Sequence, residues 1–507
     1  MAVDERRESF HVNRIAPSDL DERLLAQAYR HDLVAALQTL ATKGAKPLAT
    51  ALDGPLTQGR TPEYGEDGAI CLKTRNVIGG LIDSSSVDRV SRRFALENEG
   101  SCITNETVLM NRSGAGSIGR VSIYLGTERV FTNEELFRFR IAAPHDAAFV
   151  AVFFGTSLGE RVLERGVNGS TGQLKLVQEH VESVPVLFPH PAAQRYIGDK
   201  VRQAERLRAQ ARSLRGLVNQ SLDHVVPEYD RTVRVSSRVE SAALQARLDC
   251  RPYRSHFRAL EASIRKVRNN RLAELATSMS GDPVPSKEFT PIGIPLVRNR
   301  DIGPGGFWST EIAVSSAYAE ASSRYSAKAG LVLVAMDGEF RAQFALDLEL
   351  PLHVNQRVAM IVTTRIRPEL LTTWLNRPEG QHQLNRWAVK TTVEHTTLDH
   401  ISNVLVPRLD EDEENALADQ LLSARQADWY ARSLTFTAQT LVEQLIDGRL
   451  IEADLVAAQT ALDAGDRSAD REILKALRQS DAPGAKPLIA DVDGLYALLD
   501  GSEGQNS

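Results

Sequence analysis

The sequence predicts an α+β protein: two mixed α/β domains joined by long helices that form an antiparallel coiled-coil pair. Three observations lead to this prediction. Segments of the first half recur in the second half, in the same order, with a shift of about 220 to 227 positions. Within each copy, β-rich runs come first and a helical apolar period follows. The two helical segments also place apolar residues at matching positions, which indicates a pseudo-two-fold internal repeat.

The repeat rests on five pairs of segments that keep one order along the chain. A single pair could arise by chance, whereas five in register are not expected to. The pairs are DERLLAQAYR and QARLDCRPYR (from Asp21 and Gln245), LATALDG and LATSMSG (from Leu48 and Leu275), LKTRNVIGG and VRNRDIGPGG (from Leu72 and Val297), TNEELFRFRI and VNQRVAMIVT (from Thr132 and Val354), and ARSL at Ala211 and Ala431.

Each copy ends in a long helix. A shorter helical stretch is expected earlier, near residues 147–165 and 368–386, and an extended run then ends at Pro189 or Pro407. Beyond these prolines apolar residues recur at spacings of three, four or seven, which is typical of a helix. The seams match at Ile197 and Leu417, Val201 and Leu421, and Ala204 and Ala424. We expect the two seams to pack on each other; the alternative is that each packs on its own domain.

Composition places the chain among ordinary proteins of a reducing compartment. Of its 507 residues, 42% are hydrophobic and 25% charged, and the net charge is −6. The cysteines Cys71, Cys102 and Cys250 lie far apart, which argues against disulfides and a zinc site. No run of eighteen apolar residues occurs and the N-terminus is charged, so we expect a cytoplasmic protein without membrane contact.

Positive charge gathers in the middle of the chain. Residues 194–271 contain eighteen Lys and Arg against eight Asp and Glu, whereas an acidic run begins at Asp410. The basic stretch could neutralise phosphates, which would make binding depend on salt. It could equally be a solvated helix face or a surface for an acidic partner.

Patterns that would indicate catalysis are missing or have simpler interpretations. Residues Gly114 to Gly119 fit G-x-G-x-x-G, but an alternating β-branched run follows where a nucleotide site needs a helix, so we interpret them as a turn between strands. His395, Asp399 and His400 lack a third group for a metal, and helix-start packing is the better interpretation. We find no P-loop and no Asn-Pro-Pro-aromatic motif, and expect no enzyme activity.

The order of these segments resembles the specificity subunit of type I restriction–modification systems, up to about Leu450. The resemblance is carried by GRTPEYGEDGAICLKTRNVIGGLI, ETVLMNRSGAGSIGRVSIYLG and VPVLFPHPAAQRYI, and in the second copy by VRNRDIG, VLVAMDGEFRAQFALD, VNQRVAMI and NVLVPRL. The second copy departs from the pattern after Pro407, where DEDEEN replaces the usual P-x-x-x-Q. The last residues have no counterpart in the first copy.

The resemblance implies a division into six segments. They are an N-terminal helical segment (1–53), a first target-recognition domain (54–190), a central helical spacer (191–272), a second target-recognition domain (273–407), a C-terminal helical spacer (408–452) and an extension of unknown role (453–507). It also implies partners: double-stranded DNA, two S-adenosylmethionine-dependent adenine methyltransferase subunits, and restriction or translocase subunits. The chain itself would hold no cofactor, while S-adenosylmethionine, ATP and Mg²⁺ would bind to the partner subunits.

A duplicated module on a rigid spacer suits DNA with two half-sites, because similar grooves recur about every 34 Å. Arg, Asn and Gln on loops read guanine and adenine edges. The candidate readers are Lys73, Arg75, Asn76, Arg112, Arg120 and Asn133 in the first copy, and Arg298, Asn299, Arg300, Arg341, Asn355, Gln356 and Lys390 in the second. The LKTRN and VRNRD turns are the first choice. For each arginine the alternative is a solvated surface charge, and for Asn133 and Asn355 it is closure of a turn.

The sequence therefore predicts a non-catalytic subunit that reads a bipartite, asymmetric DNA target and directs adenine methylation and restriction by partner subunits in phage defence. One alternative is a recognition subunit of the same build in another DNA-modification or defence system. The alternative from a different class is a coiled-coil scaffold that makes no contact with DNA.

Overall fold

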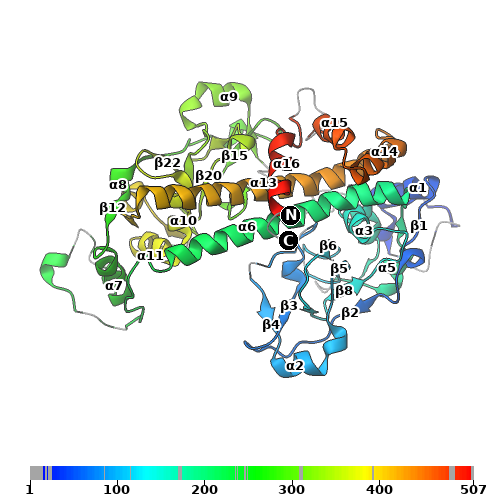
Figure 1. Cartoon of the computed structure of the whole chain (residues 1–507), viewed down its shortest axis with the longest axis horizontal. Helices are drawn as coiled ribbons and strands as arrows, with labels where there is room; N and C mark the ends of the chain where they lie inside the picture. The colour runs from blue at the N-terminus through cyan, green and yellow to red at the C-terminus, as the bar shows by residue number, and fades with distance from the viewer. Residues whose placement is uncertain are drawn as a thin grey trace. The chain divides into compact units, whose positions relative to one another are not determined.

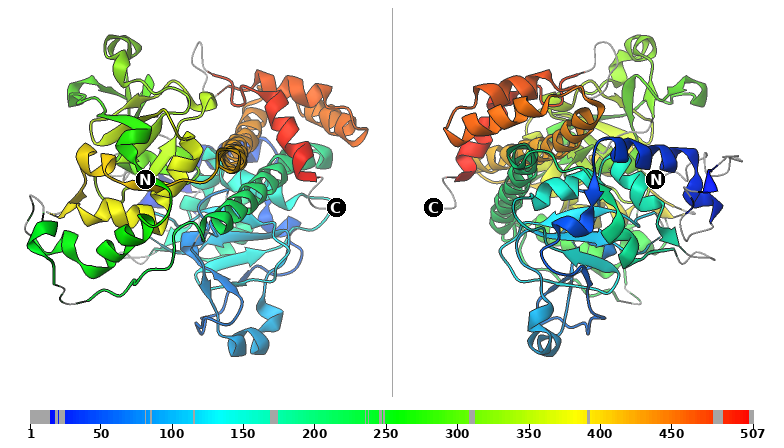
Figure 2. Two further views of the ribbon diagram at one scale, coloured as in Figure 1. Left: turned by 60° about the vertical axis from the view of Figure 1, so that its left-hand side comes forward. Right: turned by 90° about the vertical axis from the view of Figure 1, so that its right-hand side faces the viewer.

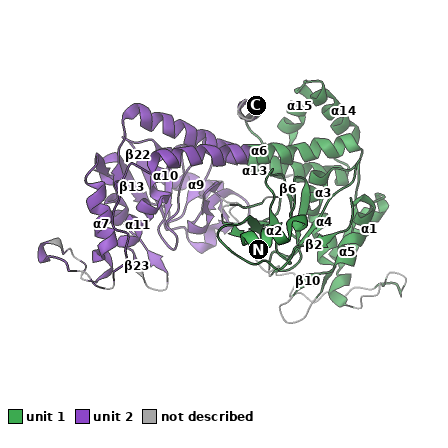
Figure 3. Ribbon diagram, turned by 60° about the horizontal axis from the view of Figure 1, so that its bottom comes forward, with its two compact units in different colours: residues 1–206, 431–492 green, residues 207–430, 493–507 purple. Residues whose placement is uncertain are grey.

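The computed structural model contains both helices and sheets, which confirms the α+β prediction. It describes residues 15–17, 20, 25–80, 82–84, 86–114, 116–168, 174–234, 236, 238–244, 247, 249–307, 312–390, 393–478 and 486–503. The chain divides into two compact units (Figure 3). Unit 1 comprises residues 1–206 and 431–492, and unit 2 comprises residues 207–430 and 493–507.

The first copy runs through short strands into helix α6. Its helices are α1 (His31–Thr42), α2 (Arg92–Glu97), α3 (Ala147–Phe154), α4 (Ser157–Glu164), α5 (Gln178–Ser183) and α6 (Pro191–Leu222). Its strands are β1 (Lys46–Pro47), β2 (Thr57–Gln58), β3 (Ile70–Leu72), β4 (Asp88–Arg89), β5 (Thr107–Asn111), β6 (Val121–Tyr124), β7 (Phe131–Thr132), β8 (Leu136–Phe139), β9 (Val167–Asn168), β10 (Lys175–Leu176) and β11 (Pro185–Val186).

The second copy repeats this order and ends in helix α13 (Figure 1). Its helices are α7 (Ser255–Ile264), α8 (Leu272–Leu275), α9 (Ser316–Ala321), α10 (Pro368–Asn376), α11 (Pro378–Arg386), α12 (Leu398–Ser402) and α13 (Glu411–Asp447). Its strands are β12 (Asn269–Arg271), β13 (Ala276–Ser280), β14 (Phe289–Thr290), β15 (Ile294–Val297), β16 (Ile302–Gly303), β17 (Gly306–Phe307), β18 (Ala313–Val314), β19 (Val332–Ala335), β20 (Ala342–Phe344), β21 (His353–Val354), β22 (Val358–Thr363), β23 (Val389–Lys390), β24 (Glu394–His395) and β25 (Leu405–Pro407).

The duplication extends to the pairing of strands. A four-stranded antiparallel sheet has the order β2-β8-β5-β6 in the first copy and β13-β22-β19-β20 in the second. A second sheet in each copy contains one parallel pair, β3 with β7 or β15 with β21. The predicted repeat of elements is therefore confirmed, whereas a two-fold relation between the copies stays a prediction. Arg23, Leu24 and Leu248 of the first pair of segments lie outside the described residues.

Local sequence explains where the short helices begin. The side chain of Ser91 accepts a hydrogen bond from Phe94 N at 3.1 Å, and the corresponding Ser315 accepts one from Tyr318 N at 3.2 Å. Asp146 caps α3 in the same way, through Phe149 N at 2.9 Å. Each cap satisfies a backbone donor that has no partner in its own helix, typically for about 1 kcal/mol. The helical stretches expected near residues 147–165 and 368–386 are each two short helices, α3 with α4 and α10 with α11.

Helices α6 and α13 pack on each other in both units. In unit 1, Ile197 and Val201 of α6 share a buried core with Leu441 and Val442 of α13. In unit 2, later residues of α6 (Val218 and Leu222) share a core with earlier residues of α13 (Leu417 and Leu421). Because the start of one helix meets the end of the other, the pair is antiparallel, as predicted. The alternative also holds in part, since the unit 1 core includes the phenylalanines of α3.

The expected central spacer (191–272) is only partly helical. Helix α6 ends at Leu222, and α7 begins at Ser255. Between them the described residues form 3-10 turns and irregular chain. Pro227 and Pro252 each lack a backbone donor, and this disfavours a helix through the segment. Of the eighteen Lys and Arg residues in the basic stretch, seven lie on α6 and eleven lie beyond Leu222.

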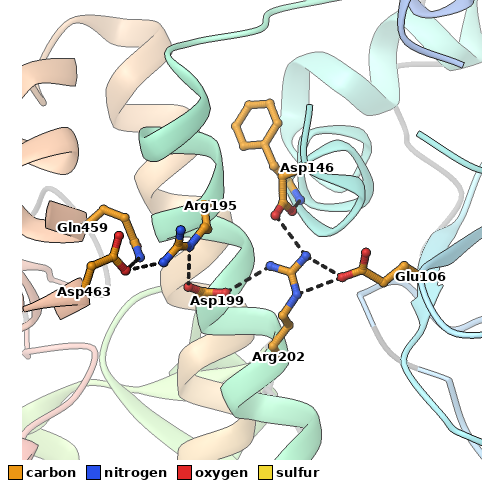
Figure 4. Close-up of polar contacts among 8 residues, drawn as sticks. Glu106, Asp146, Arg195, Asp199, Arg202, Gln459 and Asp463 are labelled. Carbon is orange, nitrogen blue, oxygen red and sulfur yellow. Dashed lines mark hydrogen bonds and ion pairs between the residues drawn. The ribbon is translucent and has the colours of Figure 1, made fainter. Parts of the chain in front are cut away.

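The C-terminal extension contains α14 (Glu452–Asp463), α15 (Ser468–Ala476) and α16 (Val492–Glu503). The first two lie along the first half of α6 within unit 1 (Figure 2). Asp470 accepts hydrogen bonds from Tyr196 Oη and Lys200 Nζ, both at 2.5 Å, and Lys200 and Asp470 are fully buried. Arg195 pairs with Asp463 nearby (Figure 4).

The opposite side of α6 holds the first domain. The Arg202 guanidinium contacts Glu106 Oε1 at 2.8 Å and Asp146 Oδ2 at 2.9 Å (Figure 4). Burial alone would lower the pKa of Arg202, but these two carboxylates raise it. The first half of α6 therefore lies between the first domain and the C-terminal helices, and polar contacts fix it on both sides.

Candidate nucleic-acid interface

The first candidate turn follows strand β3, as predicted. Lys73 leads into a 3-10 turn formed by Thr74–Asn76. Lys73 Nζ pairs with Asp88, and Arg75 Nη2 lies 2.9 Å from Asp88 Oδ1. The hydrogen bond from Lys73 lowers the pKa of Asp88; burial would lower the pKa of Lys73, but Asp88 and Tyr64 raise it. The Arg75 side chain is 51% exposed, so it is the member of the turn that can reach a ligand.

The second candidate turn follows β15 in the same way. Arg298 precedes a 3-10 turn formed by Asn299–Asp301. Arg298 lies 3.0 Å from the buried carboxylate of Asp301 and is itself mostly buried. The Arg300 side chain is 60% exposed. The two most exposed members, Arg75 and Arg300, thus occupy the same position of the repeat.

Asn76 does not belong to the exposed set. It is 2% exposed, and its Oδ1 accepts a hydrogen bond from Lys73 N at 2.9 Å. Its Nδ2 donates to the carbonyls of Asp83 and Ser86. Asp301 accepts from Arg298 N at the same distance. The buried side chain closes the turn in both copies, and we therefore remove Asn76 from the proposed readers.

The other candidates of the first copy lie at the same edge of the sheets. Asn133 N donates to Leu72 O at 3.1 Å, directly before the turn. Arg112 follows β5, where Nη1 donates to Gln58 Oε1 at 3.0 Å. Arg120 precedes β6, and its carbonyl accepts from Asn111 N at 2.9 Å. All three are half-buried, so they line the edge rather than project from it.

The second copy brings its candidates together similarly. Asn355 N donates to Val297 O at 3.0 Å, and its side chain accepts from Arg357 N at 3.2 Å, which is the turn closure considered from the sequence. Gln356 is exposed beside it. Arg341 pairs with Glu339 in the turn between β19 and β20. The backbone of Lys390 pairs with Glu394, and its side chain lies outside the described residues. Asn299 is half-buried, and its Oδ1 is a buried atom without a hydrogen-bond partner in the described chain.

Two kinds of residue that hold this edge were missed in the sequence. Asn111 is fully buried, and its Nδ2 donates to the carbonyls of Thr74, Val77 and Ser117, so it ties the first turn to the glycine-rich turn. Gly59 and Gly281 pass so close to the next strand that an added Cβ would lie 2.2 Å from Asn133 O or 2.4 Å from Asn355 O. A polar residue ending the apolar run TVLMN, and a glycine shared by both copies, were the available signals.

The loop after each turn is fixed on helix α13. In unit 1, a Cβ on Gly80 would lie 2.8 Å from the Thr435 methyl group. In unit 2, a Cβ on Gly306 would meet the Arg425 guanidinium, and Arg425 Nη1 donates to Gly305 O at 3.0 Å. Both glycines have positive φ, at 69° and 132°. Each candidate turn is therefore positioned by contact of its following loop with the same long helix.

The other patterns singled out in the sequence are structural. Gly114, Gly116 and Gly119 lie in a turn between β5 and β6, as interpreted, with Ala115 outside the described residues. Thr397 Oγ1 caps the helix that contains His400, which agrees with helix-start packing. Within the described residues no cluster of three or more His, Cys, Asp or Glu could hold a metal ion, and no helix has the length and apolar character needed to cross a membrane.

Fold and paired turns together define a duplicated α+β chain that carries one basic turn per copy on an antiparallel helix pair. The chain is similar in structure to S subunits of type I restriction–modification systems. One is the S subunit from M. genitalium, with 15% sequence identity and a TM-score of 0.42; the match covers 79% of this chain and 95% of that one. Another is the HsdS subunit from Thermoanaerobacter tengcongensis, with 14% identity and a TM-score of 0.26; the match covers 80% of this chain and 96% of that one. A third is a chain from a structure that describes complex assembly and conformational transition of a type I R-M system, with 14% identity and a TM-score of 0.28; the match covers 82% of this chain and 96% of that one. No family model and no curated protein gives a significant match to the sequence.

Proposed function

We propose that this chain is a non-catalytic, sequence-specific DNA-binding subunit that reads a bipartite target. The observation that carries the proposal is the duplicated turn, which presents Arg75 in one copy and Arg300 in the other from the same frame. Arginine reads the O6 and N7 atoms of guanine bidentately in the major groove. The two turns share one backbone arrangement but carry different side chains around the arginine. This arrangement suits two half-sites of different sequence.

The long helices support a target with a fixed gap. Helix α13 has 37 residues, about 55 Å at 1.5 Å per residue. A rigid helical spacer would hold two recognition domains at a fixed separation, which two half-sites in DNA grooves about 34 Å apart require. The exposed arginines of the loop beyond Leu222 would neutralise phosphates and make binding salt-dependent.

The chain would direct chemistry that it does not perform. We propose that two adenine methyltransferase subunits and restriction or translocase subunits bind it, and that their S-adenosylmethionine, ATP and Mg²⁺ remain on those partners. Methylation would then occur at one adenine in each half-site. The same architecture could serve a different defence or modification system, and the genes next to its own would identify which.

The decisive experiment maps methylated adenines across the genome with and without the gene. We expect one split motif to lose methylation when the gene is deleted. Exchange of residues 55–190 for the matching region of a relative should change one half of the motif and preserve the other. A change in both halves would contradict the two-domain assignment. Sequence-independent weak binding in a footprinting assay, with partner subunits present, would favour the scaffold alternative.

A further inference from the structure

The two copies differ where helix α4 or α11 ends. Arg165 Nε donates to Ala28 O at 3.3 Å, and Arg386 Nε donates to Pro252 O at 2.8 Å, so these arginines occupy corresponding positions. The next residue is Gly166 in the first copy and Trp387 in the second. The smallest side chain in one copy is therefore replaced by the largest in the other.

In the first copy a histidine fills this place. His180 is buried, and its Nε2 contacts Val162 O at 3.0 Å. A Cβ on Gly166 would lie 1.7 Å from the His180 ring. The ring can take this position only because residue 166 is glycine. Leu37 of α1 packs against the buried apolar core of unit 1.

In the second copy Trp387 prevents that arrangement. The corresponding histidine, His400 on α12, stacks on Trp387 with ring centroids 6.3 Å apart and planes inclined by 27°. Within the described chain its buried Nδ1 has no hydrogen-bond partner, and neither has the Nδ1 of His382 nearby. Burial lowers the pKa of His400, which favours the neutral imidazole. Buried nitrogens without partners suggest a ligand or water that they would contact.

These replacements leave a pocket of about 400 Å³ between α7, α11 and α12, within unit 2. Its lining combines the aromatic residues Trp387 and His400 with Arg265, Arg271 and Arg386, and the Arg386 guanidinium lies over the Trp387 ring, 5.2 Å from its centroid. Two carboxylates, Glu261 and Asp399, also line it, and Glu261 pairs with Arg386 and Arg265. Cations therefore remain in excess. The volume falls within the range of small-molecule sites, about 300–1,000 Å³.

We propose that this pocket binds a nucleoside monophosphate group, with the base on Trp387 and the phosphate at Arg271 and its neighbours. Flat aromatic rings bind bases of any sequence by stacking, and arginine binds phosphate through paired hydrogen bonds. The group could come from a free nucleotide or from an unpaired strand. Both share one chemistry, and neither is needed for the two turns to read duplex DNA.

The test measures binding of AMP to the full chain, by tryptophan fluorescence and by NMR of the indole N–H groups. Adenosine and inorganic phosphate are separate probes, and a short single-stranded oligonucleotide tests the second source. We expect AMP to bind more tightly than adenosine or phosphate. Trp387→Gly, which restores the residue of the first copy, should weaken AMP binding at least about fivefold, whereas Trp387→Phe retains it.

Arg271 has a matched control in the same segment. Arg268 is exposed, its nearest carboxylate is 4.0 Å away, and it does not line the pocket. Arg271→Ala should weaken AMP binding and Arg268→Ala should not, which keeps the proposal testable if Trp387→Gly fails to fold. Three results would overturn it: no AMP binding at millimolar concentration, unchanged affinity in folded Trp387→Gly, or equal effects of the two arginine variants. The outcome of methylation mapping, which tests the proposed function, does not depend on any of these three results.

Discussion

The two copies share a frame but differ in the chemistry of the side chains that it holds. Asn76 and Asp301 close corresponding turns with the same hydrogen bond, although one side chain is neutral and the other an acid. At the end of α4 or α11, in contrast, glycine in one copy corresponds to tryptophan in the other. The comparison shows that the hydrogen bond that closes the turn is kept in both copies, while a packed position next to a helix end differs.

The largest expected effect concerns one buried ion pair in each unit. Lys200 and Asp470 pair in unit 1, and Arg425 and Glu349 pair in unit 2. Asp470→Ala or Glu349→Ala should cost about 3–5 kcal/mol of unfolding free energy, because a buried cation loses its partner. Chemical denaturation measures this loss of unfolding free energy. Glu97→Ala, which removes one partner of an exposed ion pair, is the control, and its loss should be below about 0.5 kcal/mol. A loss of unfolding free energy under about 1 kcal/mol in one unit, with the full loss in the other, would show that the pairs are not equivalent.

The next largest effect is a loss of stability at alkaline pH that arises in the first copy only. Burial raises the pKa of Cys71 from 9.0 to about 11, whereas the corresponding residue of β15 is Leu296. The unfolded chain loses this thiol proton first, so stability is retained below about pH 9 and falls as pH rises towards 11. The loss is about 3 kcal/mol at most, at 1.36 kcal/mol for each pKa unit.

Cys71→Val removes the titrating group and should abolish that part of the decline. Unfolding free energies at pH 8 and pH 10.5, for wild type and variant, measure the difference. Equal pH dependence in the two proteins would mean that Cys71 is not the source.

A smaller effect is expected from Gly166→Ala. The added methyl group meets the buried His180 ring, and overpacking of this kind costs about 1–3 kcal/mol. Gly100→Ala is the control, since the space around Gly100 is open and its φ is not positive. Thermal unfolding compares the two variants. If they behave alike, the glycine is not what allows the histidine its position in the first copy.

The last comparison is between the effects of the two exposed arginines on DNA binding. Arg75→Ala and Arg300→Ala should each weaken specific DNA binding by about 1–3 kcal/mol and relax specificity in one half-site only. Arg93→Ala, on the exposed face of α2 in an i,i+4 pair with Glu97, is the matched control. Gel-shift titrations against targets altered in one half at a time measure both effects. Were either variant to relax both halves, the assignment of one turn to one half-site would be wrong.

Much of the fold was predictable because it depends on periodicity and order. The α+β class, the order of elements, the antiparallel helix pair and the glycine-rich turn follow from apolar spacing and turn residues near one another in the chain. The inward side chain of Asn76 and the anchoring by Asn111 were not predictable, since they depend on carbonyls brought together by folding. The same holds for the C-terminal helices on α6, where a buried Lys–Asp pair cannot be distinguished in sequence from two surface charges.

The division into units has a consequence for synthesis on the ribosome. Most of unit 2 is one continuous stretch, residues 207–430, whereas unit 1 needs Leu441, Ile446 and Leu455 to complete the core around α3 and α6. Domains of multidomain chains usually complete their folding in the order in which they emerge. Here the first domain to emerge cannot close its core until nearly the whole chain is made. A messenger truncated between codons 431 and 440 would therefore yield a chain that has residues 207–430 of unit 2 but lacks the residues of α13 and α14 that complete the core of unit 1.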